Sequence, residues 1–161
     1  MKFSVMEKGE ESEVIELVRD VFDEMISPAY TQEGVTEFYN YASIEDLAMR
    51  SSLDHFTLLA RDEDALCGII EFRLPHHVSL FFVRQSYQNR GVGKALFAEG
   101  LKQLKRRQPK VSEITVNASL NAVAAYKRIG FVAQGDGQTF KGISFVPMKR
   151  TLDAQAADTG A

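Results

Sequence analysis

The sequence predicts an α/β domain built on a mixed, mostly antiparallel sheet. Short runs in which apolar residues alternate with polar ones predict strands, and longer runs with apolar residues at helical spacing predict helices. The two kinds of run follow one another in the order β-α-α-β-β-β-α-β-α-β-β, which gives about seven strands and about four helices. With 161 residues, of which 45% are hydrophobic, the chain can bury a core without disulfides or metals.

The first third of the chain predicts one strand followed by helices. Residues 2–6 alternate weakly and form the first strand. From Val14 onward the apolar residues follow the spacing i, i+3, i+4 and i+7, which predicts an amphipathic helix ending before Pro28. Thr31 is placed to cap a second, short helix, and Ser43, with an acidic residue three positions later, marks a further helix start.

The middle of the chain changes to a strand pattern. Residues 56–60 and 66–72 alternate on either side of the polar turn 61–64, which predicts a β-hairpin. After Pro75, residues 78–83 are apolar enough for a strand in the centre of the sheet.

The rest of the chain predicts two helices and three short strands. They are a helix at 92–107, a strand at 114–116, a helix at 122–129, and closing strands at 131–133 and 143–148. Gly130 is placed to end the second of these helices, and Gly135-Asp136-Gly137 forms the turn between the closing strands. We expect a single domain over residues 1–152 and a flexible C-terminal tail over 153–161, where large apolar residues stop.

Composition excludes several classes of function. The formal net charge of −3 gives no electrostatic reason to expect a nucleic-acid partner. Cys67 is the one cysteine, so a disulfide framework or a CxxC metal site is excluded, and we expect no metal. No stretch approaches the ~18 apolar residues of a membrane span, and the N-terminus meets charge too early for a signal peptide, so we expect no membrane partner and a cytoplasmic location.

The strongest functional signal is the loop Gln88-Asn89-Arg90-Gly91-Val92-Gly93-Lys94, between a strand and a helix. A helix N-terminus presents backbone amides without intrahelical partners, and glycines let an anion approach them closely. Arg90 and Lys94 add positive charge. The loop therefore predicts a phosphate or pyrophosphate site, with a ligand-free glycine turn as the alternative. It is not a Walker A loop, and Leu96 in place of Gly or Ala excludes the dinucleotide fingerprint.

A second motif follows in residues 116–131, and the two together resemble the GCN5-related N-acetyltransferase (GNAT) superfamily. The matching residues are Gln88, Gly91 and Gly93 in the loop, Ala122, Tyr126, Gly130 and Phe131 in the later motif, and Val146, Pro147 and Met148 near the end. The resemblance extends from residue 2 to about residue 150. It implies the GNAT fold, in which the fourth strand splays from the fifth, and acetyl-CoA as co-substrate.

The resemblance also implies where acetyl-CoA binds. Backbone groups of Phe82 and Val83 meet the pantetheine arm, and the loop from Gln88 to Lys94 holds the pyrophosphate, with the backbone amides of Arg90, Gly91, Val92, Gly93 and Lys94 as donors. One position departs from the family, because Ser119 stands where many relatives carry asparagine. Asn117 and Asn121 flank it, and either is a candidate for that contact.

In this family an amine attacks the thioester directly, which requires a base for the amine and an acid for the thiolate. Tyr126 lies at the position of the family's general acid, with packing on the cofactor arm as the alternative role. His77 is the candidate base because imidazole titrates near neutrality. Glu71, or no side chain at all, are the alternatives. Cys67 lacks partners for covalent catalysis and is expected to be a core residue.

The acceptor is the least defined part of the prediction. The first two helices and their loop, which wall the acceptor site in this family, contain both aromatic and acidic residues. We expect an N-acetyltransferase that acts on a small-molecule primary amine. Acetylation of a protein lysine or N-terminus and a non-catalytic acyl-CoA sensor are the alternatives, and the resemblance leaves a homodimer open.

Overall fold

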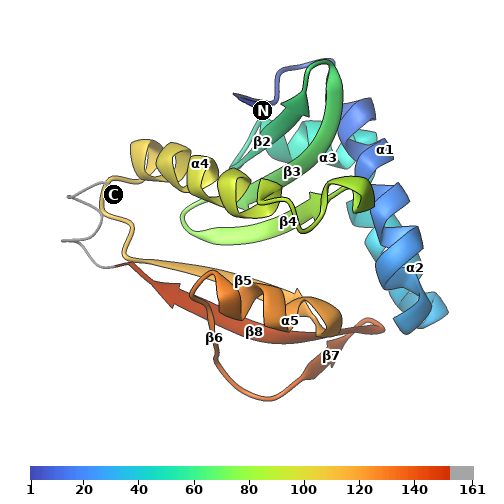
Figure 1. Cartoon of the computed structure of the whole chain (residues 1–161). Coiled ribbons are helices and arrows are strands. Elements are labelled where there is room, and N and C mark those ends of the chain that lie inside the picture. Colours follow the sequence, from blue (N-terminus) through green and yellow to red (C-terminus); the bar gives the residue numbers. More distant parts are fainter. Residues whose placement is uncertain (153–161) are drawn as a thin grey trace.

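The computed structural model describes residues 1–152, which form one mixed sheet flanked by helices (Figure 1). The strands are β1 (Lys2–Val5), β2 (His55–Asp62), β3 (Ala65–Arg73), β4 (His77–Val83), β5 (Glu113–Ser119), β6 (Val132–Ala133), β7 (Gln138–Phe140) and β8 (Ile143–Thr151). The α-helices are α1 (Glu11–Val21), α2 (Gln32–Tyr41), α3 (Ile44–Ser51), α4 (Val92–Arg107) and α5 (Val123–Arg128). The predicted tail, 153–161, lies outside the described residues.

The strand order is β1-β2-β3-β4-β5-β8-β6, with β7 also paired to β8. All neighbouring strands are antiparallel except β4 and β5, which are parallel. The predicted α/β class, the mostly antiparallel mixed sheet and the hairpin of β2 and β3 are therefore confirmed. Over residues 1–152 the sheet has eight strands and the helices number five, one more of each than predicted.

The additional helix arises near Ser43. The hydroxyl oxygen of Thr31 accepts a hydrogen bond from the Gly34 amide at the start of α2, and that of Ser43 accepts one from the Asp46 amide at the start of α3. Both predicted caps are confirmed, and they begin two separate helices. The first helix continues beyond α1 as a π-helical turn, Phe22–Ile26.

The additional strand comes from a misplaced turn. The predicted turn at residues 135–137 lies between β6 and β7 and does not join two paired strands directly. The hairpin turn is at Lys141 and Gly142, whose φ angles of 50° and 77° suit the tight turns that match the twist of antiparallel strands. This turn also contacts α2, because the Thr31 hydroxyl donates to the Gly142 carbonyl at 3.1 Å.

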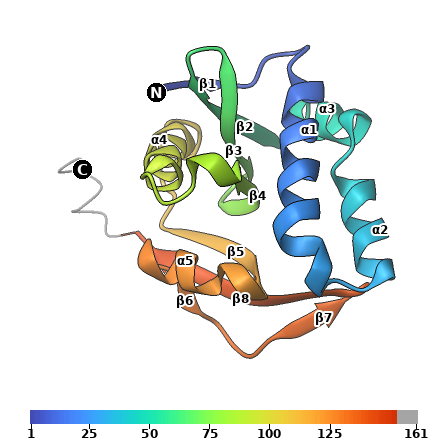
Figure 2. The same ribbon diagram turned by 45° about the vertical axis from the view of Figure 1, so that its right-hand side comes forward.

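The helices cover opposite faces of the sheet and define two buried clusters (Figure 2). On one face, α1, α2 and α3 pack through residues such as Leu17 and Leu47. On the other face, α4 packs through Leu96, and Tyr126 of α5 joins the same cluster at its edge. We call these the α1-side and α4-side clusters.

The fourth and fifth strands splay apart, as predicted. Their described pairing is limited to His77 with Thr115 and Val78 with Val116. Beyond these pairs β4 continues to Val83 while paired only to β3, and β5 continues to Ser119 while paired only to β8. Figure 1 shows the two strands diverging toward their C-terminal ends. We call this region the β4–β5 opening.

Candidate active site

The start of α4 lies beside the end of β4 and lacks a side-chain cap. Gly91 is the N-cap residue, with φ of 82° and ψ of 1°, a left-handed conformation that favours glycine. In contrast to α2 and α3, no side chain within residues 1–152 accepts from the first amides of this helix. The amides of residues 92–94 are therefore free of side-chain partners, as a bound anion requires.

Gly93 leaves space next to these amides. A Cβ atom built there would lie 3.8 Å from the nearest side-chain atoms, which belong to Phe81 and Val83 of β4. This is ordinary van der Waals distance, so one methyl group fits. A larger side chain would extend into the space between α4 and β4.

The loop before α4 is tied to β4 by Gln88. Its carboxamide nitrogen donates to the Val83 carbonyl at 2.9 Å and to the sulfur of Met25 at 3.1 Å. Asn89 has φ of 61° and is exposed. The Arg90 guanidinium lies 4.9 Å above the ring of Tyr87. The structure thus gives Gln88 a role in holding the loop, whereas the charges of Arg90 and Lys94 remain on exposed side chains.

The edge of β4 that faces β5 is open at Val83. Phe82 and Val83 pair with Ile69 and Gly68 of β3, and no pairing with β5 is present at this level within residues 1–152. Because the Arg84 amide donates to the Cys67 carbonyl of β3, the alternation of an antiparallel pair directs the backbone groups of Phe82 to β3 as well and those of Val83 to the opening. The Val83 carbonyl already accepts from Gln88, which leaves the Val83 amide for an extended ligand.

Tyr126 of α5 reaches the same region. Its ring packs edge-on against Phe81 of β4 and Phe131, at centroid distances of 6.1 and 5.3 Å. Burial raises the pKa of the Tyr126 phenol well above its ordinary value. The hydroxyl is therefore protonated at neutral pH, and it is a weaker acid than an exposed phenol.

The two candidate asparagines have different surroundings. Asn121 donates to the Met25 carbonyl at 3.1 Å and accepts from the Ser119 hydroxyl at 2.9 Å. Asn117 is exposed on β5, and no hydrogen bond within the described part of the chain uses its carboxamide. Asn121 thus joins the end of β5 to the π-helical turn, and Asn117 has unused hydrogen-bonding capacity.

His77 lies at the closed end of the opening, where β4 and β5 still pair. Its Nδ1 is 2.8 Å from the Thr115 hydroxyl. Burial, together with the nearby Arg73, His76 and His55, lowers the pKa of His77 to about 4. The imidazole is therefore neutral at pH 7, and its protonated form is disfavoured, which weakens it as a base.

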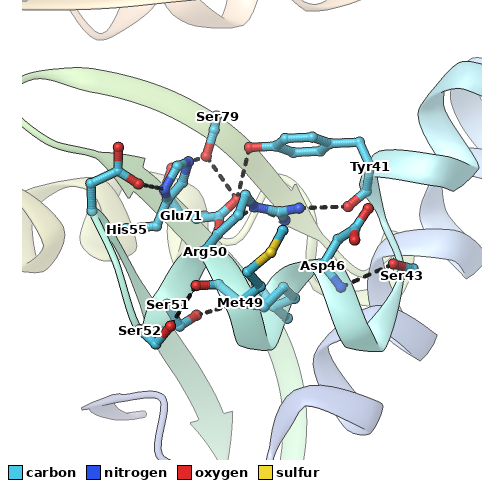
Figure 3. A network of polar contacts seen from close by, with 12 residues as sticks. Tyr41, Ser43, Asp46, Met49, Arg50, Ser51, Ser52, His55, Glu71 and Ser79 are labelled. Carbon is cyan, nitrogen blue, oxygen red and sulfur yellow. Dashed lines mark hydrogen bonds and ion pairs between the residues drawn. The ribbon is translucent and has the colours of Figure 1, made fainter.

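Glu71, the alternative base, is engaged in a buried ion pair. Its side chain is fully buried, with Oε2 3.1 Å from Nε of Arg50 and Oε1 2.8 Å from the Ser79 hydroxyl (Figure 3). The sequence analysis missed Arg50 and Ser79. Arg50 falls three residues after the buried Leu47 on α3, so its place on the apolar face was the available signal.

The lowered pKa of His77 predicts a loss of stability in acid. Because the folded-state pKa, about 4, is below the ordinary 6.5, the unfolded chain binds a proton in this range that the folded protein does not. The contribution is present above pH 6.5 and declines as the pH falls toward 4. Allowing for partial solvent exposure, we expect a loss of about 2 kcal/mol.

Urea unfolding at pH 7.5 and pH 4.5 measures this loss in the wild type and in His77→Gln. Other groups titrate in both proteins, so the difference between the two is the informative quantity. The variant should be less sensitive to acid by about 2 kcal/mol. Equal sensitivity would show that the His77 imidazole is not disfavoured in its protonated form.

Within residues 1–152, no group of three or more His, Cys, Asp or Glu side chains is arranged to hold a metal ion. None of the described helices has the length and apolar character that crossing a membrane requires.

Known proteins resemble this chain in fold. Solved structures that superpose on it include a GCN5-related N-acetyltransferase from Rhodopseudomonas palustris (21% identity, 94% of this chain and 95% of that chain, TM-score 0.78). The PaiA N-acetyltransferase from Thermoplasma acidophilum, in complex with coenzyme A, matches at 19% identity (94% and 99%, TM-score 0.75). The ribosomal-protein-S18-alanine N-acetyltransferase from Escherichia coli matches at 15% identity (94% and 94%, TM-score 0.69).

A search of the curated proteins finds no significant match. A family model described as "Acetyltransferase (GNAT) domain" matches residues 26–152, which is most of the chain. That range includes β4, the uncapped start of α4, and Tyr126. The chain therefore belongs to the GCN5-related N-acetyltransferase superfamily and is an acyltransferase.

Proposed function

We propose that the protein transfers an acetyl group from acetyl-CoA to the primary amine of a small molecule. The observation that carries the proposal is the β4–β5 opening itself. The uncapped amides of α4 lie at one end of it and Tyr126 lies against its β4 wall. One wall thus combines an anion site with a proton donor, as transfer from an acyl-CoA requires.

The residues present fit acetyl-CoA. We assign the pyrophosphate to the backbone amides of residues 90–94, with Arg90 and Lys94 adding charge. The free edge of β4 at Val83 is assigned to the pantetheine arm, whereas the backbone of Phe82 is directed to β3. Of the two asparagines, we favour Asn117 for the cofactor arm, because its carboxamide is not committed elsewhere within residues 1–152.

The chemistry follows from these positions. When bound, acetyl-CoA supplies an activated acetyl carbon. The amine nitrogen forms a bond to that carbon, the carbon–sulfur bond breaks, and Tyr126 donates its proton to the departing thiolate. The proton that the amine loses goes to water, because burial disfavours the protonated form of His77, the candidate base. His77 also lies four positions from Phe81, about 13 Å along a regular strand, so it does not reach the reacting atoms directly.

The acceptor side of the opening is narrow. A small pocket lies between the segment after α1 and the ends of β5 and β8. Its lining residues are Ile26, Ala29, Tyr30, Ser119, Leu120, Asn121 and Ser144. The hydrogen bond from Asn121 to Met25 joins two of its walls. The pocket encloses only about 20 Å³, so it does not favour a small amine over a protein segment, and that choice rests on the assay below.

Thiol release over a panel of primary amines tests the proposal, with thermal shifts measured in acetyl-CoA for the same panel. We expect turnover with at least one small amine, and that amine should raise the melting temperature further by mass action. Acetyl-CoA binding without turnover on any amine would contradict the proposal and favour an acyl-CoA sensor. An acetyl mass shift on a protein lysine or N-terminus, with no small-molecule turnover, would favour a protein acetyltransferase.

A further inference from the structure

Strand β4 contains one extra residue, Ser79. Phe72 of β3 pairs with Val78, whereas the preceding residue, Glu71, pairs with Leu80. Ser79 is therefore left over in a β-bulge, where two residues of one strand oppose one residue of its neighbour.

The bulge determines which side chains of β4 face each cluster. In a regular strand Val78, Leu80 and Phe82 would share one face, because side chains alternate with period two. In this protein Val78 belongs to the α4-side cluster, whereas Leu80 and Phe82 belong to the α1-side cluster. Phe81 is consequently directed to the α4 side, where its ring meets Tyr126 at 6.1 Å. Without the extra residue, Phe81 would face the α1 side, and Leu80 and Phe82 would face the α4 side.

The Ser79 hydroxyl is held by Glu71. It lies 2.8 Å from Oε1 of the Glu71 carboxylate and 3.2 Å from the Glu71 backbone carbonyl. Both acceptor oxygens belong to Glu71, which pairs with Leu80 directly after the bulge. The two contacts therefore fix the extra residue at the point where the alternation of β4 changes.

The carboxylate is held in turn by Arg50 (Figure 3). Arg50 Nε donates to Oε2 of Glu71 at 3.1 Å, and Nη2 donates to Oε1 at 3.3 Å. The guanidinium also donates to the Tyr41 carbonyl at 2.7 Å and lies 3.7 Å from the centroid of the Tyr41 ring. The Tyr41 hydroxyl donates to Glu71 at 3.4 Å. Four elements, α2, α3, β3 and β4, thus meet at one fully buried carboxylate.

A stabilising role alone explains this arrangement poorly. Taking two charges out of water costs about as much as their attraction returns, so a buried ion pair is weak evidence for stability. The pair instead gives Ser79 an ionised acceptor in a fixed place, and a hydrogen bond to a charged acceptor is stronger than one between neutral groups.

We propose that Glu71, oriented by Arg50, is a positioning residue that acts through the Ser79 hydroxyl to hold the β4 bulge and so aligns Phe81 and Tyr126 with the β4–β5 opening. The proposal rests on the proposed function in one respect, which is that the alignment of Phe81 and Tyr126 serves acetyl transfer. It makes no use of Glu71 as a base, since both carboxylate oxygens accept from Arg50.

The test compares three substitutions at the two hydroxyl residues that flank Glu71, Ser79 on β4 and Thr57 on β2. Ser79→Ala removes the contact with Glu71, and Ser79→Thr retains a hydroxyl. Thr57→Val is the matched control: Thr57 pairs with Glu71 from the other neighbouring strand, is fully buried, and has a hydroxyl without a partner in the described structure. Direct substitution of Arg50 is avoided, because it would leave a buried carboxylate unpaired and strongly destabilise the fold.

We expect Ser79→Ala to lower kcat by about 10-fold, as one misplaced positioning group does, while the KM for acetyl-CoA changes less than about 2-fold. Ser79→Thr should restore most of kcat, and Thr57→Val should leave it unchanged. An unchanged kcat in Ser79→Ala, an equal loss in Thr57→Val, or failure of threonine to rescue would each overturn the proposal.

A second readout separates this proposal from the proposed function. Amide NMR shifts of Leu80, Phe81 and Tyr126 require no amine acceptor. In Ser79→Ala these amides should move, and in Thr57→Val they should remain in place. If the wild type acetylates no amine yet these shifts occur, the proposed function fails and the bulge anchor stands. If turnover is normal and the shifts are absent, the anchor fails alone.

Discussion

Replacing Tyr126 by phenylalanine is expected to lower kcat by about 100-fold, the lower end of what general acid catalysis contributes. The substitution removes only the hydroxyl. The ring keeps its contacts with Phe81 and Phe131, so the fold and the affinity for CoA should be retained. The loss should therefore appear in kcat, with little change in the KM for acetyl-CoA.

Steady-state kinetics with the best amine of the panel measures this effect. Tyr87→Phe is the matched control, because it removes a phenol that donates to Asp62 outside the opening. We expect the control to keep wild-type kcat. If Tyr126→Phe also keeps wild-type kcat, Tyr126 only packs against the cofactor arm, and the acid is solvent or another group.

Gly93→Val is expected to weaken CoA binding by at least ~10-fold, equivalent to about 1.4 kcal/mol. A Cβ atom at this position lies at van der Waals distance from Phe81 and Val83, but two further methyl groups crowd the space beside the helix amides. Gly93→Ala is the control and should bind CoA nearly as well as the wild type. Lys94→Gln should weaken CoA binding less than Gly93→Val does, because the backbone donors and the helix dipole remain.

Isothermal titration with CoA and with pantetheine, which lacks the pyrophosphate, locates the loss. Valine at position 93 should affect CoA more than pantetheine, while the circular dichroism spectrum stays nearly unchanged. Normal CoA binding by Gly93→Val would show that the loop is a glycine turn and not a pyrophosphate site.

The sequence was sufficient where a local pattern determines the structure. The hydroxyl caps at Thr31 and Ser43 were predictable because capping depends on residues three positions apart. The loop before α4 and the motif ending at Phe131 identified the family and, with it, the splayed strands. The residues of both motifs lie against the β4 wall of the same opening, which no spacing in the chain could show.

The features that the sequence analysis predicted wrongly or missed depend on contacts between segments that are distant in the chain. The turn at Lys141 and Gly142 uses a positive φ in lysine, which is rare, so the glycines at 135 and 137 drew the prediction instead. The link from Arg50 to Glu71 joins residues 21 positions apart, through a helix and a strand. The neutral state of His77 likewise follows from burial, which the sequence does not reveal.

Amide NMR spectra of isotope-labelled protein during a CoA titration test most directly where the cofactor lies. We predict the largest shifts at the amides of residues 91–94, at the start of α4, and at Val83 on the free edge of β4. Pantetheine should shift the Val83 amide and leave those of 91–94 in place. Saturable CoA binding that leaves the amides of 91–94 unshifted would contradict the assignment of the pyrophosphate to this helix.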